Sequence, residues 1–309
     1  MIANRMAPVL ILEEPTHMPR DSGKAAYVIG VDLGTSSLKA LLLRQDGWVA
    51  GAITRSYPLA MPQPGWAEQD PQEWWIIACA AIRALLDDTG VTPAAVRAIA
   101  VGGQMHGTVL LDDRGMPLRP AIIWPDGRTA RESAQAEEAL RARRLLGRLG
   151  GGVSPGFMLA SLLWCRRHEP ERWRRVRTVL LPKDYLRFRL TGSLATEPSD
   201  GSGIPLIDLE SVGGPDPTGA NAGWDWCFPA LEALDLSPAL LPPLLASAAP
   251  AGLITPAAAL ATGLIEGTPV LCGGSDQAMA AIGAGLLAPG TLLISISTGG
   301  QLVTPLARP

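Results

Sequence analysis

Three short apolar segments separated by turn residues lie near the start of the chain. Residues 27–32 are apolar and rich in β-branched side chains, and residues 38–43 and 48–56 carry similar runs. Gln45-Asp46-Gly47 supplies turn chemistry between the second and third segments. The pattern predicts three strands joined by tight turns, which together form an antiparallel meander.

A long helix is predicted to follow the meander. Asp70 is a good N-cap, Pro71 suits the first helical position, and Glu73 completes a capping box. The strongly apolar body of the helix runs to Leu86, and Gly90 is a typical C-terminal stop.

Strands and helices are predicted to alternate along the rest of the chain. A buried strand at 98–101 is followed by a hairpin-like pair of strands, 108–111 and 120–124. The arginine-rich segment 127–190 is predicted to be mainly helical, with its charges on solvated helix faces. The later predictions are a Gly/Pro-rich surface loop at 212–221, an irregular segment at 238–250, a strand at 270–274, a helix at 277–288 and a strand at 291–297. This alternation indicates an α/β fold.

The composition excludes several classes of protein. Of 309 residues, 47% are hydrophobic and 18% are charged, which is too apolar for a disordered chain. The formal net charge of −3 gives no support for a nucleic-acid or anionic-membrane partner. The sequence lacks an apolar run of the roughly 18 residues that a membrane span needs, and its four cysteines are widely spaced, as in reduced proteins. We therefore expect a cytoplasmic protein.

The turn between the first two predicted strands is a candidate phosphate site. Asp32 ends the first strand, and Gly34, Thr35, Ser36 and Ser37 form the turn. A glycine turn can direct backbone N–H groups at a phosphate, and a carboxylate at its rim can hold Mg²⁺. A hairpin turn without any ligand explains the same residues equally well. The motif is not a Walker A loop, because it joins two strands and has no G-x-x-x-x-G-K-S/T.

A second glycine turn lies near the end of the chain. Ser297 is followed by Thr298, Gly299 and Gly300, again between two predicted strands. Two such turns in one chain indicate the two-lobed architecture of the actin-like nucleotidases, in which paired hairpins hold phosphates from opposite sides. The pairing therefore favours phosphate transfer as the function.

Polar side chains follow two of the predicted strands. Gln104, Met105 and His106 come after a buried strand and a Gly-Gly pair, while Trp124 and Asp126 end a later strand. Ligands often bind at the carboxyl ends of strands in α/β sheets. An amide, an imidazole and a thioether suit a polyol, and an aromatic ring beside a carboxylate suits a sugar. The alternatives are a structural histidine bonded to a carbonyl and a simple Pro-Asp-Gly turn.

Asp276 is the candidate general base. It follows Gly273-Gly274-Ser275, at the end of one predicted strand and the start of a helix. In phosphoryl transfer, an aspartate held near a substrate hydroxyl accepts its proton as the new phosphorus–oxygen bond forms. An aspartate that only caps the helix is the structural alternative.

Together these motifs resemble the FGGY carbohydrate kinases. The resemblance runs from Val28 to about Val303 and rests on strings that are more specific than one glycine turn. They include IGVDLGTSSLKALLL (29–43), GWAEQDPQEWW (65–75), GGQMHGTVLLDDRG (102–115), AIIWPDGR (121–128), VLLPKDYLRFRLTG (179–192), SDGSG (199–203), GGSDQA (273–278) and ISTGG (296–300). The resemblance implies an actin-like (ribonuclease H-like) ATPase lobe with a mixed β-sheet flanked by helices, followed by the first hairpin of a second such lobe.

The resemblance also implies a reaction, in which the γ-phosphate of ATP is transferred with Mg²⁺ to a terminal hydroxyl of a ketopentose. D-Xylulose is the first expectation, with ribulose or a polyol as alternatives. The resemblance also implies that Asp276 is the catalytic base and that Asp32 lies beside the metal. The other positions that it implies are Gly34, Thr35, Ser36, Ser37, Thr298, Gly299 and Gly300 around the phosphates, Met105 and His106 on the sugar, and Gln104, Trp124, Asp126, Gln277, Lys183 and Asp184 around the sugar pocket.

The chain departs from the family pattern in ways that bear on the sugar and on the domains. Gln277 and Pro125 both stand where the pattern has Asn. Family members continue through a second lobe that carries the adenosine pocket. We therefore expect a flexible extension at 1–26, a sugar-binding lobe at 27–288, and the start of a nucleotide-binding lobe at 289–309.

We expect the chain alone to turn over weakly or undetectably. A second copy of the chain or a separately encoded C-terminal lobe would then be its protein partner, beside the pentulose and ATP. A sugar-binding module without kinase activity and a generic actin-like ATPase are the alternative functions.

Overall fold

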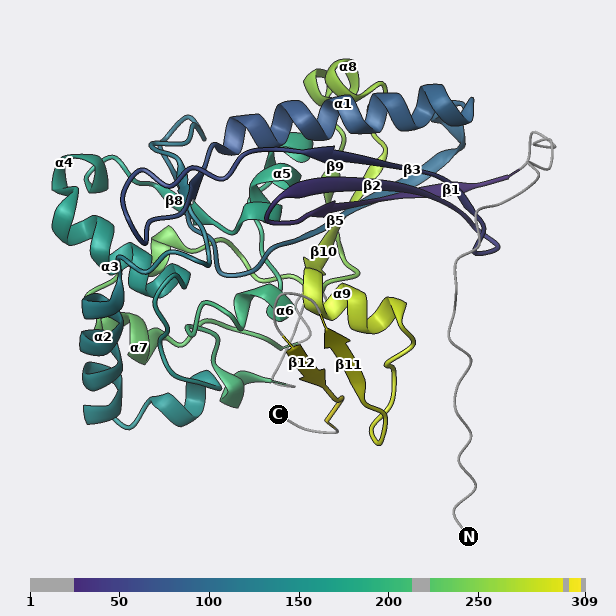
Figure 1. The fold of residues 1–309 in the computed structure, drawn as a ribbon. Coiled ribbons are helices and arrows are strands. Elements are labelled where there is room, and N and C mark those ends of the chain that lie inside the picture. The colour runs from purple at the N-terminus through teal and green to yellow at the C-terminus, as the bar shows by residue number, and fades with distance from the viewer. Residues whose placement is uncertain (1–24, 213–222, 297–299, 307–309) are drawn as a thin grey trace, which may run out of the picture.

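The computed structural model describes residues 25–212, 223–296 and 300–306, and its centre is a mixed β-sheet (Figure 1). The strands of this sheet are β1 (Tyr27–Leu33), β2 (Ser37–Arg44), β3 (Val49–Ser56), β5 (Val96–Gly103), β9 (Pro250–Leu253) and β10 (Pro269–Ser275). Their order across the sheet is β3-β2-β1-β5-β10-β9. Strands β1, β5 and β10 are parallel, whereas β2, β3 and β9 are antiparallel to their neighbours. The predicted meander and the α/β fold are confirmed.

Helices cover one face of the sheet. Helices α1 (Pro71–Thr89), α5 (Pro182–Thr191) and α8 (Pro256–Thr262) contact one another and pack over the strands (Figure 1). On β1, alternate side chains from Tyr27 to Leu33 are buried beneath them, whereas Val28, on the opposite face, is 41% exposed. Because strand side chains alternate between faces, β1 has one packed face and one open face.

The boundaries of α1 are those that the sequence predicts. The carboxylate of Asp70 accepts a hydrogen bond from the Gln72 N–H at 2.9 Å, and Pro71 is the first helical residue. Gly90 adopts a left-handed conformation, and its N–H donates to the Leu86 carbonyl at 3.0 Å. Both ends are therefore fixed by local chemistry.

A second group of helices packs beside the sheet around its own apolar core. These helices are α2 (Ala130–Ala142), α3 (Met158–His168), α4 (Pro170–Trp173) and α7 (Phe228–Ala233), at the left of Figure 1. The short helix α6 (Pro198–Gly201) and α9 (Asp276–Gly283) contact β10. The prediction that 127–190 is mainly helical is confirmed.

The predicted hairpin-like pair of strands at 108–111 and 120–124 is confirmed only in part. Strand β6 (Val109–Leu111) pairs with β8 (Thr178–Leu180), which lies inside the segment predicted to be helical. Strand β7 (Ala121–Ile122) pairs with β4 (Glu68–Gln69). Across the turn itself, residues 108 and 122 form one antiparallel bridge, residues 111 and 117 form a second, and the Leu118 N–H donates to the Leu110 carbonyl at 2.9 Å. The local turn is therefore present, but the strands that pair with β6 and β7 lie more than fifty residues away in sequence, where local patterns carry no information.

The last predicted elements are present but shorter than expected. Helix α9 starts one residue before the predicted helix and ends at Gly283 rather than 288. Strand β11 (Leu293–Ile296) pairs with β12 (Gly300–Val303) in a separate two-stranded sheet. Nearly all of the predicted loop at 212–221 lies outside the described residues. Within the described part of the chain, no helix has the length and apolarity required to span a bilayer.

Candidate active site

The carboxyl ends of three parallel strands bring two aspartates to one edge of the sheet. Asp32 on β1 is paired with Gly102 on β5, and Gly102 is in turn paired with Gly274 on β10. Asp276 follows the last residue of β10 and begins α9. The end of β5 therefore lies between the two strands that carry the aspartates, at the edge where α/β sheets bind ligands.

Glycines keep the strand ends between these aspartates free of side chains. A Cβ at Gly102 would come within 3.2 Å of the Gly274 carbonyl oxygen, and one at Gly103 within 2.9 Å of Leu33. Gly273 has a φ of 84° where the register of β10 against β5 shifts, a conformation that other residues rarely adopt. The Gly-Gly pairs noted in the sequence therefore allow β1, β5 and β10 to approach closely.

The carboxylate of Asp32 is incompletely satisfied by protein groups. Its Oδ1 is buried and has no hydrogen-bond partner among the described residues. Burial raises the pKa of Asp32, and Lys39, directly opposite on β2, partly offsets that effect. Among the described residues, no cluster of three or more His, Cys, Asp or Glu side chains could hold a metal. A single carboxylate of this kind suits Mg²⁺, which usually takes one or two protein carboxylates together with phosphate oxygens and water.

Asp276 lies in the first turn of α9 but is not its N-cap. Ser275 has that role, because its Oγ accepts from the Ala278 N–H at 3.4 Å. Burial raises the pKa of Asp276, the N–H of Gln277 lowers it by donating to Oδ1 at 2.7 Å, and the charge of Asp32 raises it further. The capping alternative is therefore not what the structure shows. Gln277 itself is half-buried.

The turn that follows Asp32 is closed and held through its carbonyl groups. The N–H of Gly34 donates to the Ser37 carbonyl at 3.0 Å. The hydroxyl of Tyr57 donates to the Gly34 carbonyl, and Nε2 of Gln69 donates to the Thr35 carbonyl at 2.6 Å. The predicted glycine turn is confirmed, and it is fixed by side chains that sequence inspection did not single out.

Gln104 supports this turn from within the protein. Its side chain is 1% exposed, and Nε2 donates to Oε1 of Gln69 at 2.9 Å and to the Gly34 carbonyl at 3.3 Å. Oε1 of Gln104 is buried without a hydrogen-bond partner among the described residues. The structure thus places Gln104 between the sheet edge and the turn.

His106 has a geometry that fixes its tautomer. Its φ is 70°, its ring stacks on Phe157 with centroids 3.7 Å apart, and Nδ1 lies 3.0 Å from the Gly203 carbonyl oxygen. Burial lowers the pKa of His106, although the bond to Gly203 partly opposes this. In the neutral ring Nδ1–H donates to the carbonyl, which leaves Nε2 as a hydrogen-bond acceptor. Met105, the preceding residue, is half-buried.

Trp124 and Asp126 have different surroundings although they are two residues apart. The ring of Trp124 is 48% exposed, and its Nε1–H donates to Oγ1 of Thr35 at 2.8 Å. Asp126 is buried, and its carboxylate accepts from the Ala67 N–H at 2.6 Å and from Arg128 at 2.7 Å. The geometry gives Trp124 an exposed face, whereas Asp126 is engaged in holding the loop.

The second glycine turn lies mostly outside the described residues. Thr298 and Gly299 are not described, whereas Gly300 begins β12 and is paired with Ile296. The strands predicted on either side of the turn are confirmed as β11 and β12.

A buried cluster of charged residues lies behind Asp276. Lys183 and Arg187 from α5 meet the carboxylates of Asp184, Glu197 and Asp200, and all five side chains are fully buried. Nζ of Lys183 is 2.7 Å from Asp184, 3.3 Å from Glu197 and 3.9 Å from Asp200. Burial lowers the pKa of Lys183, but the three carboxylates outweigh it and raise the pKa overall.

Asp200 is the carboxyl in this cluster that lacks hydrogen-bond donors. Both of its oxygens are buried without a partner among the described residues, and burial raises its pKa well above the ordinary value. Its segment also contacts the site, because Oγ of Ser199 accepts from the Ser275 N–H at 3.0 Å, and Gly203 bonds His106. The sequence strings SDGSG (199–203) and VLLPKDYLRFRLTG (179–192) contain every residue of this cluster except Glu197, but nothing local indicated that their charges meet.

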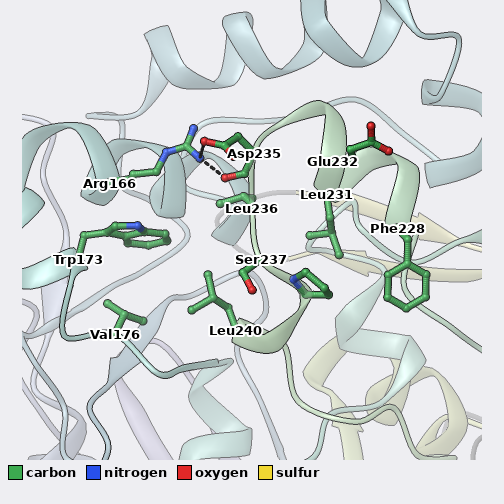
Figure 2. Close-up of a pocket in the computed structure, with 11 residues that line it drawn as sticks. Arg166, Trp173, Val176, Phe228, Leu231, Glu232, Asp235, Leu236, Ser237 and Leu240 are labelled. Atoms are coloured by element: carbon green, nitrogen blue, oxygen red, sulfur yellow. Dashed lines mark hydrogen bonds and ion pairs between the residues drawn. The ribbon is translucent and has the colours of Figure 1, made fainter.

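A separate cavity of about 680 Å³ lies among the helices beside the sheet (Figure 2). Its walls include Trp173 of α4 and Phe228 and Leu231 of α7. Arg166 donates to the Leu234 carbonyl at 3.0 Å and is 3.6 Å from the Asp235 carboxylate. The cavity contains none of the residues at the sheet edge, so it is distinct from the candidate active site.

The fold is that of the N-terminal lobe of a family of carbohydrate kinases. Residues 27–283 match the model of the N-terminal domain of the FGGY family of carbohydrate kinases. The chain belongs to the FGGY family.

The most similar proteins found include xylulose kinases from two bacteria. The chain is 39% identical over 272 residues to xylulose kinase of Escherichia coli (strain K12), and 37% identical over 278 residues to that of Bacillus subtilis (strain 168). The alignments cover 88% and 90% of this chain and 53% of each relative. The crystal structure of xylulose kinase from Rhodospirillum rubrum matches with a TM-score of 0.81 and 33% identity, over 90% of this chain and 55% of that one. The chain thus spans about half the length of the curated relatives it matches.

Proposed function

We propose that the chain supplies the sugar- and phosphate-binding half of a kinase that phosphorylates D-xylulose to D-xylulose 5-phosphate with ATP. The observation that carries this proposal is the pair of aspartates, Asp32 and Asp276, on either side of the glycine end of β5. Membership of the FGGY family supports a carbohydrate acceptor and ATP. The names of the similar proteins favour D-xylulose among the pentuloses.

The side chains proposed for the sugar side of the site suit a small polyol. Nε2 of His106 is a hydrogen-bond acceptor for a sugar hydroxyl, and the exposed face of Trp124 offers a surface for the C–H groups of the sugar. Met105 and Gln277 are the half-buried neighbours that would shape the pocket. Asp126 would act indirectly, by holding the loop that carries Trp124.

Asp276 would act as the general base. As the hydroxyl oxygen of the sugar bonds to the γ-phosphorus, its proton moves to the Asp276 carboxylate. The bond between that phosphorus and the β–γ bridging oxygen breaks, and ADP leaves with the electron pair. The raised pKa of Asp276 supports this role, because a more basic carboxylate accepts a proton more readily.

Asp32 and the glycine turn fit the phosphate end of the reaction. Oδ1 of Asp32, which has no hydrogen-bond partner in the described part of the chain, suits Mg²⁺ as a hard oxygen ligand, and Mg²⁺ when bound neutralises phosphate charge. Gly34, whose N–H donates to the Ser37 carbonyl, would shape the turn, and the N–H groups and hydroxyls of Thr35, Ser36 and Ser37 would bind phosphate oxygens beside it, with Thr298, Gly299 and Gly300 as the proposed counterpart.

Titration calorimetry on the 309-residue chain tests the sugar site. We expect D-xylulose to bind, and His106→Ala to weaken binding at least about fivefold because one acceptor is lost. Phe228→Ala, in the separate cavity, is the matched control and should leave binding unchanged. If D-xylulose does not bind while D-ribulose or xylitol does, the substrate assignment is wrong.

A coupled ADP-release assay tests transfer. Release that requires both D-xylulose and MgATP supports the kinase. Sugar binding that nucleotide never affects, without ADP release, supports a binding module instead. ATP hydrolysis that is independent of any sugar supports a generic ATPase.

A further inference from the structure

A hydrogen bond from a half-exposed indole joins the proposed sugar side of the site to the proposed phosphate side. Nε1–H of Trp124, in the loop after β7, donates at 2.8 Å to Oγ1 of Thr35 in the turn after β1. The two residues are 89 positions apart in sequence and belong to different strands' loops. The bond is therefore a side-chain contact between two loops that are not adjacent in the chain.

The chemistry of the two groups fixes the direction of this bond. An indole N–H can only donate, so the Thr35 hydroxyl must accept through a lone pair. The hydroxyl hydrogen of Thr35 then points away from the indole and can be donated to an acceptor. A phosphate oxygen bound at the same turn would be such an acceptor.

The position of the indole also makes it sensitive to a ligand on the sugar side. Its ring is half exposed, so a bound sugar can contact it directly. Gly156 lies against the Trp124 carbonyl, so closely that a Cβ there would overlap it, and the next residue, Phe157, stacks on His106. The loop that carries the indole is thus linked to the Phe157–His106 stack through the Trp124 carbonyl and Gly156, while the indole itself bonds the Thr35 hydroxyl.

We propose that the Trp124–Thr35 hydrogen bond couples occupancy of the sugar site to anion binding at the glycine turn. This inference rests on the proposed function. A sugar that settles against the indole favours the ring position in which Nε1–H bonds Thr35, and an anion that accepts from Thr35 favours the same arrangement. Binding of either ligand then strengthens binding of the other by an equal factor.

The size of the coupling follows from the bond. One hydrogen bond is worth about 0.5–1.5 kcal/mol, which corresponds to a factor of roughly 2–10 in affinity. Trp124→Phe keeps an aromatic ring and removes the N–H. Thr35→Val keeps the shape and removes the acceptor, whereas Thr35→Ser keeps the hydroxyl.

Nuclear magnetic resonance of the indole N–H groups provides a direct measurement. The sequence has nine tryptophans, and the Trp124 signal is identified by its loss in Trp124→Phe. With magnesium tripolyphosphate alone as the probe, we expect the Trp124 signal to shift in the wild type and in Thr35→Ser but not in Thr35→Val. An anion that does not bind, or that binds without moving this signal, overturns the inference.

Adding D-xylulose completes the test. We expect the dissociation constant of the anion to fall about 2- to 10-fold with sugar present in the wild type, and to be unaffected by sugar in Trp124→Phe. Trp173→Phe, in the separate cavity, is the matched control. If Trp124→Phe retains the full effect, the coupling does not use this bond and the inference is wrong. If the wild type fails to bind D-xylulose, the substrate assignment fails, and the anion titration alone decides whether the bond responds.

Discussion

Replacing Asp200 with asparagine tests how the buried charged cluster balances its charge. Two cations, Lys183 and Arg187, face the three carboxyls of Asp184, Glu197 and Asp200, so the cluster is neutral only if one carboxyl keeps its proton. Asp184 accepts from both cations, at 2.7 and 2.9 Å, and Glu197 accepts two backbone N–H groups, at 2.7 and 3.0 Å. The oxygens of Asp200 have no such donors among the described residues. We therefore expect the proton on Asp200.

The expected effect on stability has a definite sign. Burial raises the pKa of Asp200, and the charges of Asp184, Glu197 and Asp276 add to it, while Lys183 opposes them. The folded protein then holds a proton that the unfolded chain releases above pH of about 4. The free energy of unfolding falls as the pH rises from there, by at most about 1.4 kcal/mol per pH unit, until the folded carboxyl itself titrates. Asparagine has no titrating proton, so the free energy of unfolding of the variant does not fall with pH for this reason.

Urea unfolding followed by tryptophan fluorescence between pH 4.5 and 7.5 measures the difference. We expect the free energy of unfolding of Asp200→Asn, relative to the wild type, to increase with pH over this window. Asp184, whose pKa is lowered because Lys183 and Arg187 outweigh its burial, is ionised in the folded and unfolded states of both proteins over most of this window and adds no slope to the difference. Asp88→Asn, at an exposed position, is the control and should give a curve parallel to the wild type. Parallel curves for Asp200→Asn would refute a neutral Asp200.

Three further substitutions test the site and its support. In any preparation of the protein that turns over, Asp276→Asn should lower the ADP-release rate by about 10²–10⁴ and leave D-xylulose affinity within about tenfold, since the base acts in the chemical step; loss of binding alone would contradict the role. Gly103→Ala should lower the free energy of unfolding by about 1–3 kcal/mol, because its Cβ would lie 2.9 Å from Leu33. Gly30→Ala, which has open space at its Cβ, should not lower it, and equal effects of the two substitutions in thermal denaturation would count against the close-packing argument. Asp70→Ala should cost about 1 kcal/mol in urea unfolding through loss of the α1 cap, and an unchanged midpoint would show that the cap is dispensable.

Local chemistry made part of this fold predictable from the sequence. The meander and α1 depend on turn residues, apolar runs and caps that lie within a few positions of one another, and each is found where the pattern placed it. Asp32 and Asp276 could be singled out because glycines beside them marked strand ends. The pairing of β6 with β8 and of β4 with β7 could not be predicted, because their partners lie far away in the sequence.

In the candidate site, too, local features could be predicted from the sequence, whereas contacts between distant segments could not. That Asp32 and Asp276 share one edge follows from the parallel order of β1, β5 and β10, which a single sequence does not reveal. The same holds for Gln104, whose amide is buried against Gln69, and for Asp126, whose carboxylate is turned toward Arg128. Residue type and position after a strand suggested polar groups near a ligand, but only the packing distinguishes an exposed side chain from a buried one.

The position of β10 has a consequence for the order in which the protein is made. Strand β5 ends at Gly103, but its neighbour β10 begins only at Pro269, roughly 165 residues later. At about 5–20 residues per second, a ribosome needs roughly 10–30 s to synthesise that interval. During this time the nascent chain has Asp32 and the glycine turn that follows it but not Asp276, and one edge of β5 lacks its partner, which is the kind of edge that invites mispairing. The interval between these two strands is therefore the stage of synthesis at which the chain most needs protection from association.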